Sequence, residues 1–310
     1  MPKIVFLDEY SLGRSDLSGI RSLGNYTGYE YTRPEEVVTR CLNAEIVITN
    51  KVVLGRNELQ QLPHLRLICV AATGTNNIDL DAAAELGITV RNAAGYSTHS
   101  VAETTLGMAL ALVRQIGYYD DFVKSGKWSE SERQFHFGRP IRQLHGATWG
   151  IIGLGAIGRE VARLATAFGC RIVYTSTSGV TREEEYPALS LDELLAESDI
   201  VSIHAPLNER TRGLIGEREL ATMKSSALLI NVARGGIVDE KALAAALDAE
   251  KIGGAALDVF EAEPTPAQNP LLHLHDSERL LLAPHSAWAS GDAVETLIGC
   301  IIDNIKTYYK

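Results

Sequence analysis

The stretch that decides the fold is residues 148–168, T-W-G-I-I-G-L-G-A-I-G-R-E-V-A-R-L-A-T-A-F. A short apolar run precedes three closely spaced glycines, and apolar residues at helical spacing follow them, which predicts a strand, a glycine turn and a helix. In such a turn Gly153 would permit the tight bend, Gly155 would let the backbone approach a pyrophosphate, and Gly158 would let helix and strand pack closely. The helix N-terminus favours an anion at that point. A purely structural glycine turn is the alternative, and the flanking strand and helix disfavour it.

The length and charge of the chain exclude several classes of protein. With 310 residues the chain is long enough for two domains. A net charge of -10 argues against binding to nucleic acid through its phosphates. No apolar run has the length of a membrane helix, and no signal peptide is visible at the N-terminus. We therefore expect a cytoplasmic protein with no membrane or nucleic-acid partner.

The cysteines and histidines do not form a metal-binding pattern. Four cysteines lie scattered in or beside apolar segments, where we expect buried, reduced thiols: Cys41, Cys69, Cys170 and Cys300. His273 and His275 flank one leucine, but no cysteine or histidine stands at zinc spacing from them. A solvated loop is the simpler interpretation of this pair, and we expect no metal site.

Short apolar runs alternate with polar helical segments in the N-terminal third, which is typical of a parallel sheet with helices on both faces. Strands are expected at residues 3–7, 46–49, 67–71 and 88–91, and helices at residues 34–42 and 80–86. Open sheets bind ligands at the carboxyl ends of their strands. One such end is residues 72–77, A-T-G-T-N-N, where small residues leave backbone amides open to an anion. A plain strand-to-helix connection is the alternative there.

A long helix is expected from Ser97, and it is apolar nearly all round, which favours burial. Residues 117–144 are polar but rich in aromatic side chains, and they predict an arm or a subunit interface. A second alternating unit follows the glycine turn. Its strands are expected at residues 171–175, 200–204, 227–231 and 255–259, and its helices near residues 191–196, 217–223 and 241–249.

The last expected helix, residues 291–308, comes after the second sheet is complete, so we expect it to return to the first domain. The expected fold class is α/β, with two doubly wound parallel-sheet domains. Residues 99–287 would form a Rossmann-type dinucleotide-binding domain. Residues 1–98 with 288–310 would form a discontinuous, flavodoxin-like substrate domain.

Three further segments follow the carboxyl ends of expected strands, where ligands bind in such folds. They are residues 231–236, N-V-A-R-G-G, residues 258–264, D-V-F-E-A-E-P, and residues 283–288, A-P-H-S-A-W. Singly, each has a plain interpretation as a solvated turn, an acidic loop or a surface histidine. Together, Arg234, Glu263 and His285 at strand ends of a nucleotide fold predict a catalytic set.

These motifs resemble those of the D-isomer-specific 2-hydroxyacid dehydrogenase family over nearly the whole chain. The glycine turn at residues 153–158, the arginine motif at residues 231–236, Glu263-Pro264 and Pro284-His285 carry the resemblance. Residues 71–79 and 284–290 most resemble the glycerate dehydrogenases, also called hydroxypyruvate reductases. The resemblance implies a homodimer formed through the long helix and the aromatic arm.

The resemblance also implies which residues bind the ligands. The substrate carboxylate would meet the amides of Thr73, Gly74 and Thr75, and Asp258 would hold the nicotinamide carboxamide. The full set of cofactor contacts implied is Gly153, Gly155, Ala156, Ile157, Gly158, Ser176, Thr177, His204, Ala205, Pro206, Val232, Ala233, Asp258 and His285.

The residue types suit the reduction of a 2-keto acid. His285 can donate a proton to the carbonyl oxygen and take it back in the reverse direction. Glu263 would orient the imidazole ring and stabilise its charged form. Arg234 presents a planar fork that can hold a carboxylate and polarise the adjacent carbonyl. Trp288 could form a wall of the substrate site, or it could be a core tryptophan.

The cofactor preference departs from the common pattern, in which an acid about 20 residues beyond the first glycine binds the ribose. Residues 173–178, V-Y-T-S-T-S, contain none, and the carboxylates at residues 183–185 come too late in the chain to serve. The hydroxyls of Ser176 and Thr177 could donate to a 2′-phosphate, with Arg182 as counter-charge. We therefore predict that NAD and NADP are both used.

Two alternatives remain open. A nucleotide-sensing binding protein of the same fold, like the transcriptional corepressors, could keep these residues, although such proteins use additional partner-binding surface. A dehydrogenase of the same family could instead act on lactate or 3-phosphoglycerate. The sequence offers no obvious basic cluster for a substrate phosphate.

Overall fold

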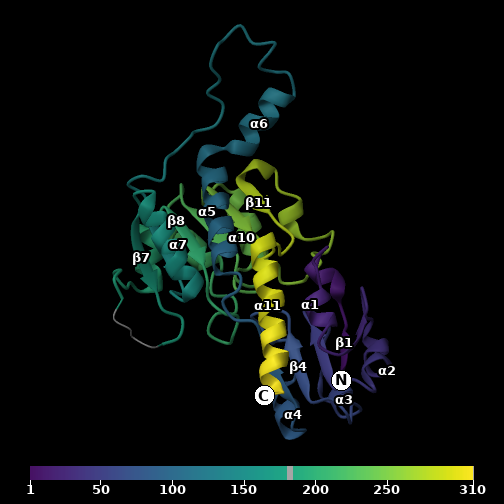
Figure 1. Cartoon of the computed structure of the whole chain (residues 1–310). Coiled ribbons are helices and arrows are strands. Elements are labelled where there is room, and N and C mark those ends of the chain that lie inside the picture. The colour runs from purple at the N-terminus through teal and green to yellow at the C-terminus, as the bar shows by residue number, and fades with distance from the viewer. Residues whose placement is uncertain (180–183, 310) are drawn as a thin grey trace. The chain divides into compact units, whose positions relative to one another are not determined.

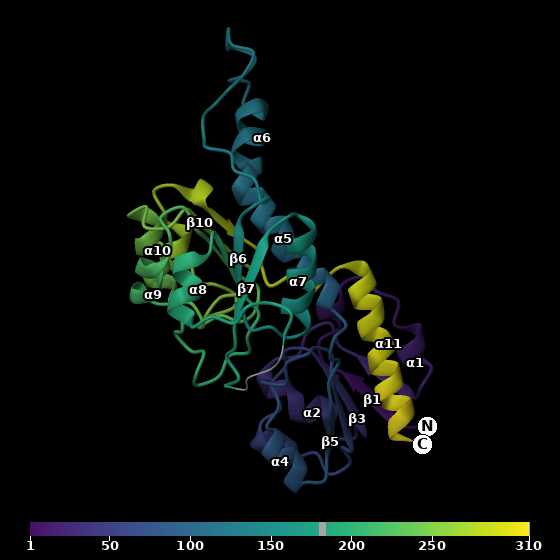
Figure 2. The same ribbon diagram turned by 90° about the vertical axis from the view of Figure 1, so that its left-hand side faces the viewer.

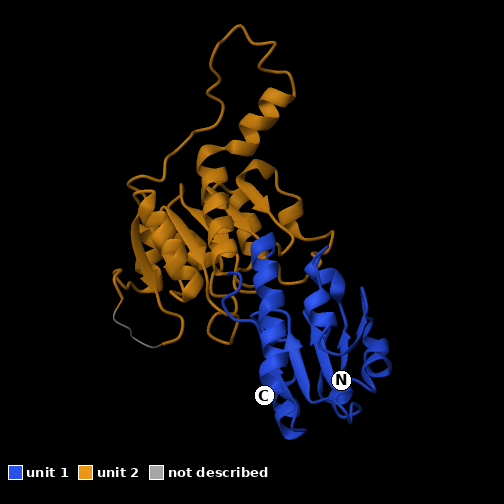
Figure 3. Cartoon of the chain, in the orientation of Figure 1, with its two compact units in different colours: residues 1–97, 289–310 blue, residues 98–288 orange. Residues whose placement is uncertain are grey.

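The computed structural model describes residues 1–179 and 184–309 of the chain. The chain divides into two compact units, which Figure 3 distinguishes by colour. Unit 1 comprises residues 1–97 and 289–310, and unit 2 comprises residues 98–288. Among the described residues, no helix combines the length and the apolarity needed to cross a membrane.

Unit 1 is built on a five-stranded sheet in the order β2-β1-β3-β4-β5, with every pair of neighbours parallel (Figure 1). This order is the flavodoxin-like one. The strands are β1 (Lys3–Phe6), β2 (Asn25–Gly28), β3 (Ile46–Thr49), β4 (Leu67–Val70) and β5 (Thr89–Arg91). All residues of β3 and β4 are buried, as expected for central parallel strands covered on both faces.

Helical segments connect these strands, and the last helix of the chain joins them. They are η1 (Glu9–Leu12), α1 (Ser18–Arg21), η2 (Pro34–Glu36), α2 (Val37–Cys41), α3 (Arg56–Leu59), α4 (Leu80–Glu85) and α11 (Gly291–Tyr308). Helix α11 packs against β4 and α1 through an apolar face that includes Leu297 and Ile301. Asn304 Nδ2 donates to the carbonyl of Asn92 at 3.0 Å, and Arg91 donates to the carbonyl of Asn304 at 2.9 Å. The C-terminal helix is therefore an integral part of unit 1.

Unit 2 is built on a six-stranded parallel sheet in the order β11-β10-β9-β8-β6-β7 (Figure 2). The next strand, β7, lies on one side of β6, and the strands from β8 onward lie on its other side, so the direction of the strand order reverses at β6. Strand β6 carries the glycine turn at its carboxyl end. The strands are β6 (Thr148–Ile152), β7 (Arg171–Thr175), β8 (Ile200–Ile203), β9 (Leu228–Asn231), β10 (Gly254–Leu257) and β11 (Leu280–Leu282).

Helices cover both faces of this sheet. They are α5 (Thr98–Arg114), α6 (Ile116–Lys124), α7 (Ala156–Ala167), α8 (Leu191–Glu197), α9 (Glu217–Thr222) and α10 (Glu240–Asp248), with the short segments η3 (Pro270–Leu272) and η4 (Ser277–Arg279). Successive side chains of β9 enter opposite cores: Leu229 joins the cluster under α8, α9 and α10, whereas Leu228 and Ile230 join the cluster under α5 and α7. The expected fold of two doubly wound parallel-sheet domains is confirmed.

Several details differ from the expectation. Edge strands β2 and β11 and the short segments η1, α1 and α3 were not predicted, whereas η2 with α2 and α4 lie where helices were expected. Helix α5 buries one face, including Val101, Met108 and Leu112, but leaves Glu103 and Arg114 exposed, so it is less buried than its composition suggested. Burial raises the pKa of the thiols of Cys41 and Cys69 to about 12. All four cysteines are free thiols, although Cys300 is only half-buried.

The aromatic arm expected at residues 117–144 consists of α6 and a long return segment, which Figure 1 shows extending away from the rest of unit 2. The ring of His136 stacks on Phe122 with the ring centroids 3.7 Å apart, and its Nε2 lies 2.9 Å from the hydroxyl of Tyr118. Trp128, Phe135 and Phe137 in the return segment are exposed. The arm thus has its own internal contacts and an apolar surface open to solvent.

Candidate active site

The three glycines of the turn after β6 meet different surroundings. Gly153 has a φ of +93°, which suits glycine, and a Cβ there would lie 3.0 Å from backbone atoms of His204 and Ala205. A Cβ on Gly158 would lie 2.4 Å from the carbonyl oxygen of Gly153. A Cβ on Gly155 would meet no atom within 4 Å. Two glycines are therefore required by close packing, and the third leaves open space beside the N-terminus of α7.

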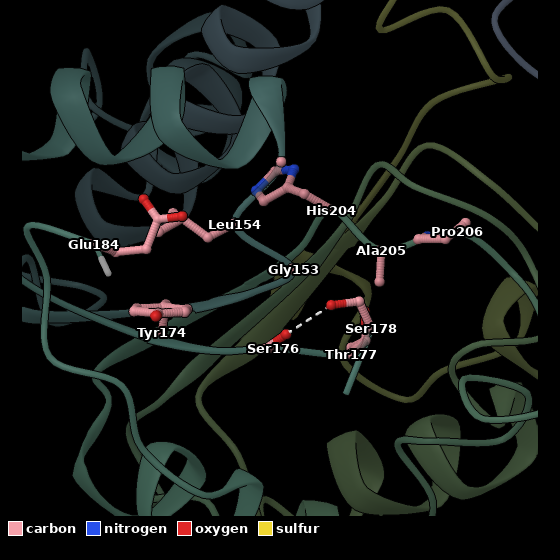
Figure 4. A pocket seen from close by; sticks show the side chains of 11 residues that line it. Gly153, Leu154, Tyr174, Ser176, Thr177, Ser178, Glu184, His204, Ala205 and Pro206 are labelled. Atoms are coloured by element: carbon pink, nitrogen blue, oxygen red, sulfur yellow. Dashed lines mark hydrogen bonds between the residues drawn. The ribbon is translucent and has the colours of Figure 1, made fainter. Parts of the chain in front are cut away.

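That open space adjoins a pocket over the carboxyl ends of β6, β7 and β8. Figure 4 shows Leu154 and Glu184 on one side of it, Ala205 and Pro206 on the other, and Ser176 hydrogen-bonded to Ser178. Ala156 and Ile157, the first residues of α7, follow the glycine turn directly. Ser176 and Thr177 line the pocket as the sequence predicts, whereas Arg182 and Glu183 lie outside the described residues.

Glu184 corrects one sequence expectation. The carboxylates after the serine loop were expected to come too late in the chain to serve the site, yet Glu184 lines this pocket beside Tyr174. Its carboxylate pairs with the guanidinium of Arg159, whose Nε lies 3.3 Å from Oε2. Distance along the sequence was a poor guide because Ala188, fourteen residues after Tyr174, forms a parallel bridge with it, so this part of the chain lies beside β7.

His204 supplies a buried polar atom with no partner among the described residues. Its Nε2 lies 2.9 Å from the hydroxyl of Ser202, and that hydroxyl also accepts from the indole of Trp149 at 2.9 Å. Its Nδ1 is shielded from solvent and makes no hydrogen bond to a described residue. Burial lowers the pKa of His204 to about 3, so the ring is neutral near pH 7. An uncharged polar atom at the pocket and an open glycine cradle both fit a bound dinucleotide.

The other half of the same sheet edge carries the charged residues. Beyond β9, Asn231 shapes a loop by donating to the carbonyl of Arg234 at 2.9 Å and accepting from the amide of Ala233 at 3.1 Å. Val232 is buried, and Ala233 is half-buried. Arg234 Nη1 donates to the carbonyl of Ala233 at 2.7 Å, and no carboxylate of the described residues forms an ion pair with Arg234.

The loops after β9 and β10 touch at Gly235, where a Cβ would lie 1.7 Å from the carbonyl oxygen of Phe260. Phe260 belongs to the loop that carries Glu263. The amide of Phe260 donates to Glu263 Oε1 at 3.0 Å. Only glycine permits this approach, and it fixes the arginine loop against the glutamate loop.

Glu263 and His285 form a close pair. Glu263 Oε2 lies 2.6 Å from His285 Nδ1, and the two side chains retain 32% and 22% of their exposure. A carboxylate on Nδ1 holds the tautomer and orients the ring so that Nε2 is the atom that exchanges a proton. His285 has a φ of +54°, a left-handed conformation that few non-glycine residues adopt, and such residues cluster at functional sites.

Asp258 holds the histidine loop. Its carboxylate, 1% exposed, accepts from the amides of Ser286 at 2.7 Å and Ala287 at 3.0 Å, and its carbonyl accepts from the amide of His285 at 2.7 Å. Burial raises the pKa of Asp258, although these amides oppose the rise. This anchoring role, like that of Asn231, was not recognised in the sequence, where Asp258 was expected only to hold the nicotinamide carboxamide and Asn231 only to begin the arginine motif.

Trp288, at the end of unit 2, packs against the core cluster under α5 and α7 and is partly buried. This contact agrees with the core interpretation of Trp288. In unit 1, the loop after β4 presents Thr73, Gly74 and Thr75. None of their three amides donates a hydrogen bond to another described residue, while the carbonyl of Thr73 accepts from Asn92 at 2.6 Å. Three successive amides without protein partners suit an anion.

Comparison with known proteins identifies the family. The model of the D-isomer specific 2-hydroxyacid dehydrogenase, NAD binding domain, matches residues 106–287. A glycerate dehydrogenase of Methylorubrum extorquens is 40% identical over 310 residues, which cover 99% of this chain and 96% of that protein. A hydroxypyruvate reductase of Blautia hydrogenotrophica is 33% identical over 315 residues, covering 99% and 97%.

A solved structure agrees. The acyclic imino acid reductase Bsp5, in complex with NADPH and D-Arg, is 28% identical, covers 99% of this chain and 97% of its own, and superimposes with a TM-score of 0.88. With the matched domain model, the full-length relatives and this shared fold, the chain belongs to the D-isomer-specific 2-hydroxyacid dehydrogenase family.

Proposed function

We propose that this dehydrogenase reduces hydroxypyruvate to D-glycerate. Glyoxylate would be its second substrate. The names of two full-length relatives, a glycerate dehydrogenase and a hydroxypyruvate reductase, support this substrate class. The observation that carries the proposed chemistry is the contact of 2.6 Å between His285 Nδ1 and Glu263 Oε2, on the strand edge that also holds Arg234.

We assign the two ligands to separate parts of the chain. Residues 99–287 would bind the nicotinamide cofactor, and residues 1–98 with 288–310 would bind most of the substrate. The glycine cradle after β6 and the unpartnered Nδ1 of His204 support the first assignment. The amides of Thr73, Gly74 and Thr75 support the second, because they can hold the substrate carboxylate.

In the proposed reaction the bound nicotinamide supplies the hydride that reduces C2 of the keto acid. His285 donates the proton from Nε2 to the carbonyl oxygen, while Glu263 holds Nδ1 and stabilises the imidazolium. Arg234 binds the carboxylate with its planar fork and polarises the adjacent carbonyl. Asp258 keeps the histidine loop in place, and it would also accept from the nicotinamide carboxamide.

For the cofactor we propose use of both NADH and NADPH. The end of β7 carries hydroxyls at Ser176 and Thr177 in place of the acid that commonly selects NAD, and Val232, Ala233, Ala205 and Pro206 would complete the contacts. The domain model that matches the chain is named for NAD, and the Bsp5 relative was solved with NADPH. The ratio of kcat/KM for NADPH over NADH tests the proposal. Preference for one cofactor by more than about 10³ would contradict it.

We further propose a homodimer that buries the aromatic arm. Trp128, Phe135 and Phe137 of the arm are exposed, and aromatic side chains of this kind are enriched at interfaces. Light scattering coupled to size-exclusion chromatography should give twice the mass of the chain. Replacing Trp128 and Phe137 by serine should shift the mass toward that of the monomer.

The substrate proposal is tested with a panel of hydroxypyruvate, glyoxylate, pyruvate and 3-phosphohydroxypyruvate, each assayed with both reduced cofactors. Hydroxypyruvate should have the highest kcat/KM and glyoxylate the second, with D-glycerate as the product of the first. We propose Trp288, which also packs against the core under α5 and α7, as the aromatic wall that limits substrate size. If 3-phosphohydroxypyruvate ranks first, the proposed substrate is wrong.

A further inference from the structure

The wall of the cofactor pocket carries an ion pair that the sequence did not reveal. Glu184 lines the pocket, and its side chain is 14% exposed. Arg159, on the first turns of α7 directly after Gly158, contacts both carboxylate oxygens of Glu184 through Nε and Nη2. A planar guanidinium that contacts both oxygens of a carboxylate fixes the geometry of the pair as well as adding attraction. The acid in the pocket lining, Glu184, is therefore paired with a cation from α7 that lies next to that lining.

The carboxylate and the guanidinium of this pair favour different groups at the ribose 2′ position of a dinucleotide. A free ribose 2′-hydroxyl donates well to a carboxylate, whereas a 2′-phosphate is repelled by one and attracted by a guanidinium. Glu184 alone would exclude NADP, and Arg159 alone would favour it. Paired, they present little net charge, so neither ribose form is strongly refused.

We propose that Glu184 and Arg159 together determine how the enzyme distinguishes the ribose 2′-hydroxyl from the 2′-phosphate, with Glu184 as the acceptor for the hydroxyl and Arg159 as the counter-charge for the phosphate. This inference rests on the proposed cofactor site and adds the residues that set its selectivity. Glu184 takes the role that an acid at the end of β7 has in NAD-specific relatives of the fold.

Arg210 is the competing base. Its Nη1 donates to the carbonyl of Ser178 at 3.0 Å, so it lies against the same loop. Arg210 is exposed and contacts the main chain there, whereas Arg159 contacts the carboxylate that lines the pocket. A change of charge at Arg159 is therefore felt directly at Glu184.

The test measures the Kd of NADH and NADPH by fluorescence titration of the full-length enzyme without substrate. The variants are Glu184→Gln, Arg159→Gln and Arg210→Gln. Arg163→Gln is the matched control, because Arg163 pairs with Glu160 one turn further along α7, and Glu160 is also 14% exposed. Titrations with 5′-AMP and 2′,5′-ADP repeat the comparison on the adenosine portion alone, and the melting temperature of each variant reports its folding.

Glu184→Gln should tighten the binding of NADPH and weaken the binding of NADH. The ratio of the two Kd values should therefore change by about tenfold or more. Arg159→Gln should weaken NADPH by about tenfold and leave NADH within about twofold, with the same pattern for the two adenosine fragments. Arg163→Gln should change neither ratio. The proposal is overturned if both pocket variants shift NADH and NADPH by one common factor, or if Arg210→Gln and not Arg159→Gln weakens NADPH. If the wild type binds neither cofactor, the proposed cofactor site itself is wrong.

Discussion

The two halves of one sheet edge in unit 2 are built by different means. Around β6, β7 and β8 the edge is formed by the glycine turn and by the side chains of Ser176 and Thr177. Its shape depends on where a Cβ can fit. Around β9, β10 and β11 the edge carries Arg234, Glu263 and His285. Hydrogen bonds within their own loops hold the main chain of Arg234 and the carboxylate of Glu263, and Glu263 in turn holds His285. The first half is a shaped surface for binding, and the second is a set of oriented charged groups for chemistry. Changes on the two halves should therefore have separable effects.

The strongest test of this separation is His285→Ala. Loss of a general acid typically lowers the rate by about 10²–10⁴, so kcat for hydroxypyruvate should fall by that order. The Kd of NADH, measured by fluorescence titration, should stay within about threefold of wild type because the glycine half is untouched. If the variant keeps the kcat of the wild type, His285 is not the proton donor.

Arg234→Lys should have the next largest effect. Lysine keeps the positive charge but loses the planar fork, so kcat/KM for the keto acid should fall by about ten- to a hundredfold. The assay varies the keto acid at saturating NADH and measures the cofactor Kd separately. An equal loss in cofactor binding would place Arg234 on the cofactor phosphates.

The glycine half is tested with a matched pair of alanine variants. Gly158→Ala forces a Cβ against the carbonyl of Gly153 and should destabilise the fold by about 1–3 kcal/mol, measured by urea unfolding. Gly155→Ala meets no protein atom and should leave stability unchanged while it weakens NADH binding, because the methyl group enters the space proposed for the pyrophosphate. Equal stability losses in the two variants would contradict the different surroundings of the two glycines.

The last effect, expected in the pH dependence of stability and not in activity, concerns His204. Burial lowers its pKa to about 3 in the folded protein, below the value near 6.5 expected when unfolded. The unfolded chain therefore takes up a proton first, and stability should fall as the pH decreases from about 6.5 toward 3, by no more than about 1.4 kcal/mol per pH unit. His204→Asn should flatten this part of the curve of unfolding free energy against pH, and His64→Asn, at an exposed position, should not. A curve that His204→Asn leaves unchanged would show that the folded ring titrates freely.

The sequence was informative where a function depends on local spacing. The glycine turn lies within six residues, and its strand and helix follow from apolar periodicity, so its place at the edge of a parallel sheet could be predicted. Arg234, Glu263 and His285 were found because each follows the carboxyl end of a strand. Edge strand β2 was missed because its residues are mostly exposed and show no apolar alternation.

Contacts made across the sequence could not be predicted in this way. Asp258 anchors a loop 28 residues further along the chain, and Glu184 lines a pocket that it was expected to follow too late in the chain to reach. Neither residue type nor spacing distinguishes such a carboxylate from one on a solvated turn. Only the path of the connecting chain brings it to its partner.

The separation between the two halves is tested most directly by the ratio of the Kd values of NADPH and NADH in four proteins: wild type, Ser176→Asp, His285→Ala and the double variant. Ser176→Asp adds a negative charge beside the proposed ribose site and should raise the ratio by about tenfold, whereas His285→Ala alone should leave the ratio unchanged. The effects of substitutions at independent sites combine to within about twofold. The change in the Kd ratio caused by Ser176→Asp should therefore be the same with or without His285. A ratio that His285→Ala alters, or a shift that differs by more than about tenfold between the two backgrounds, would contradict the separation.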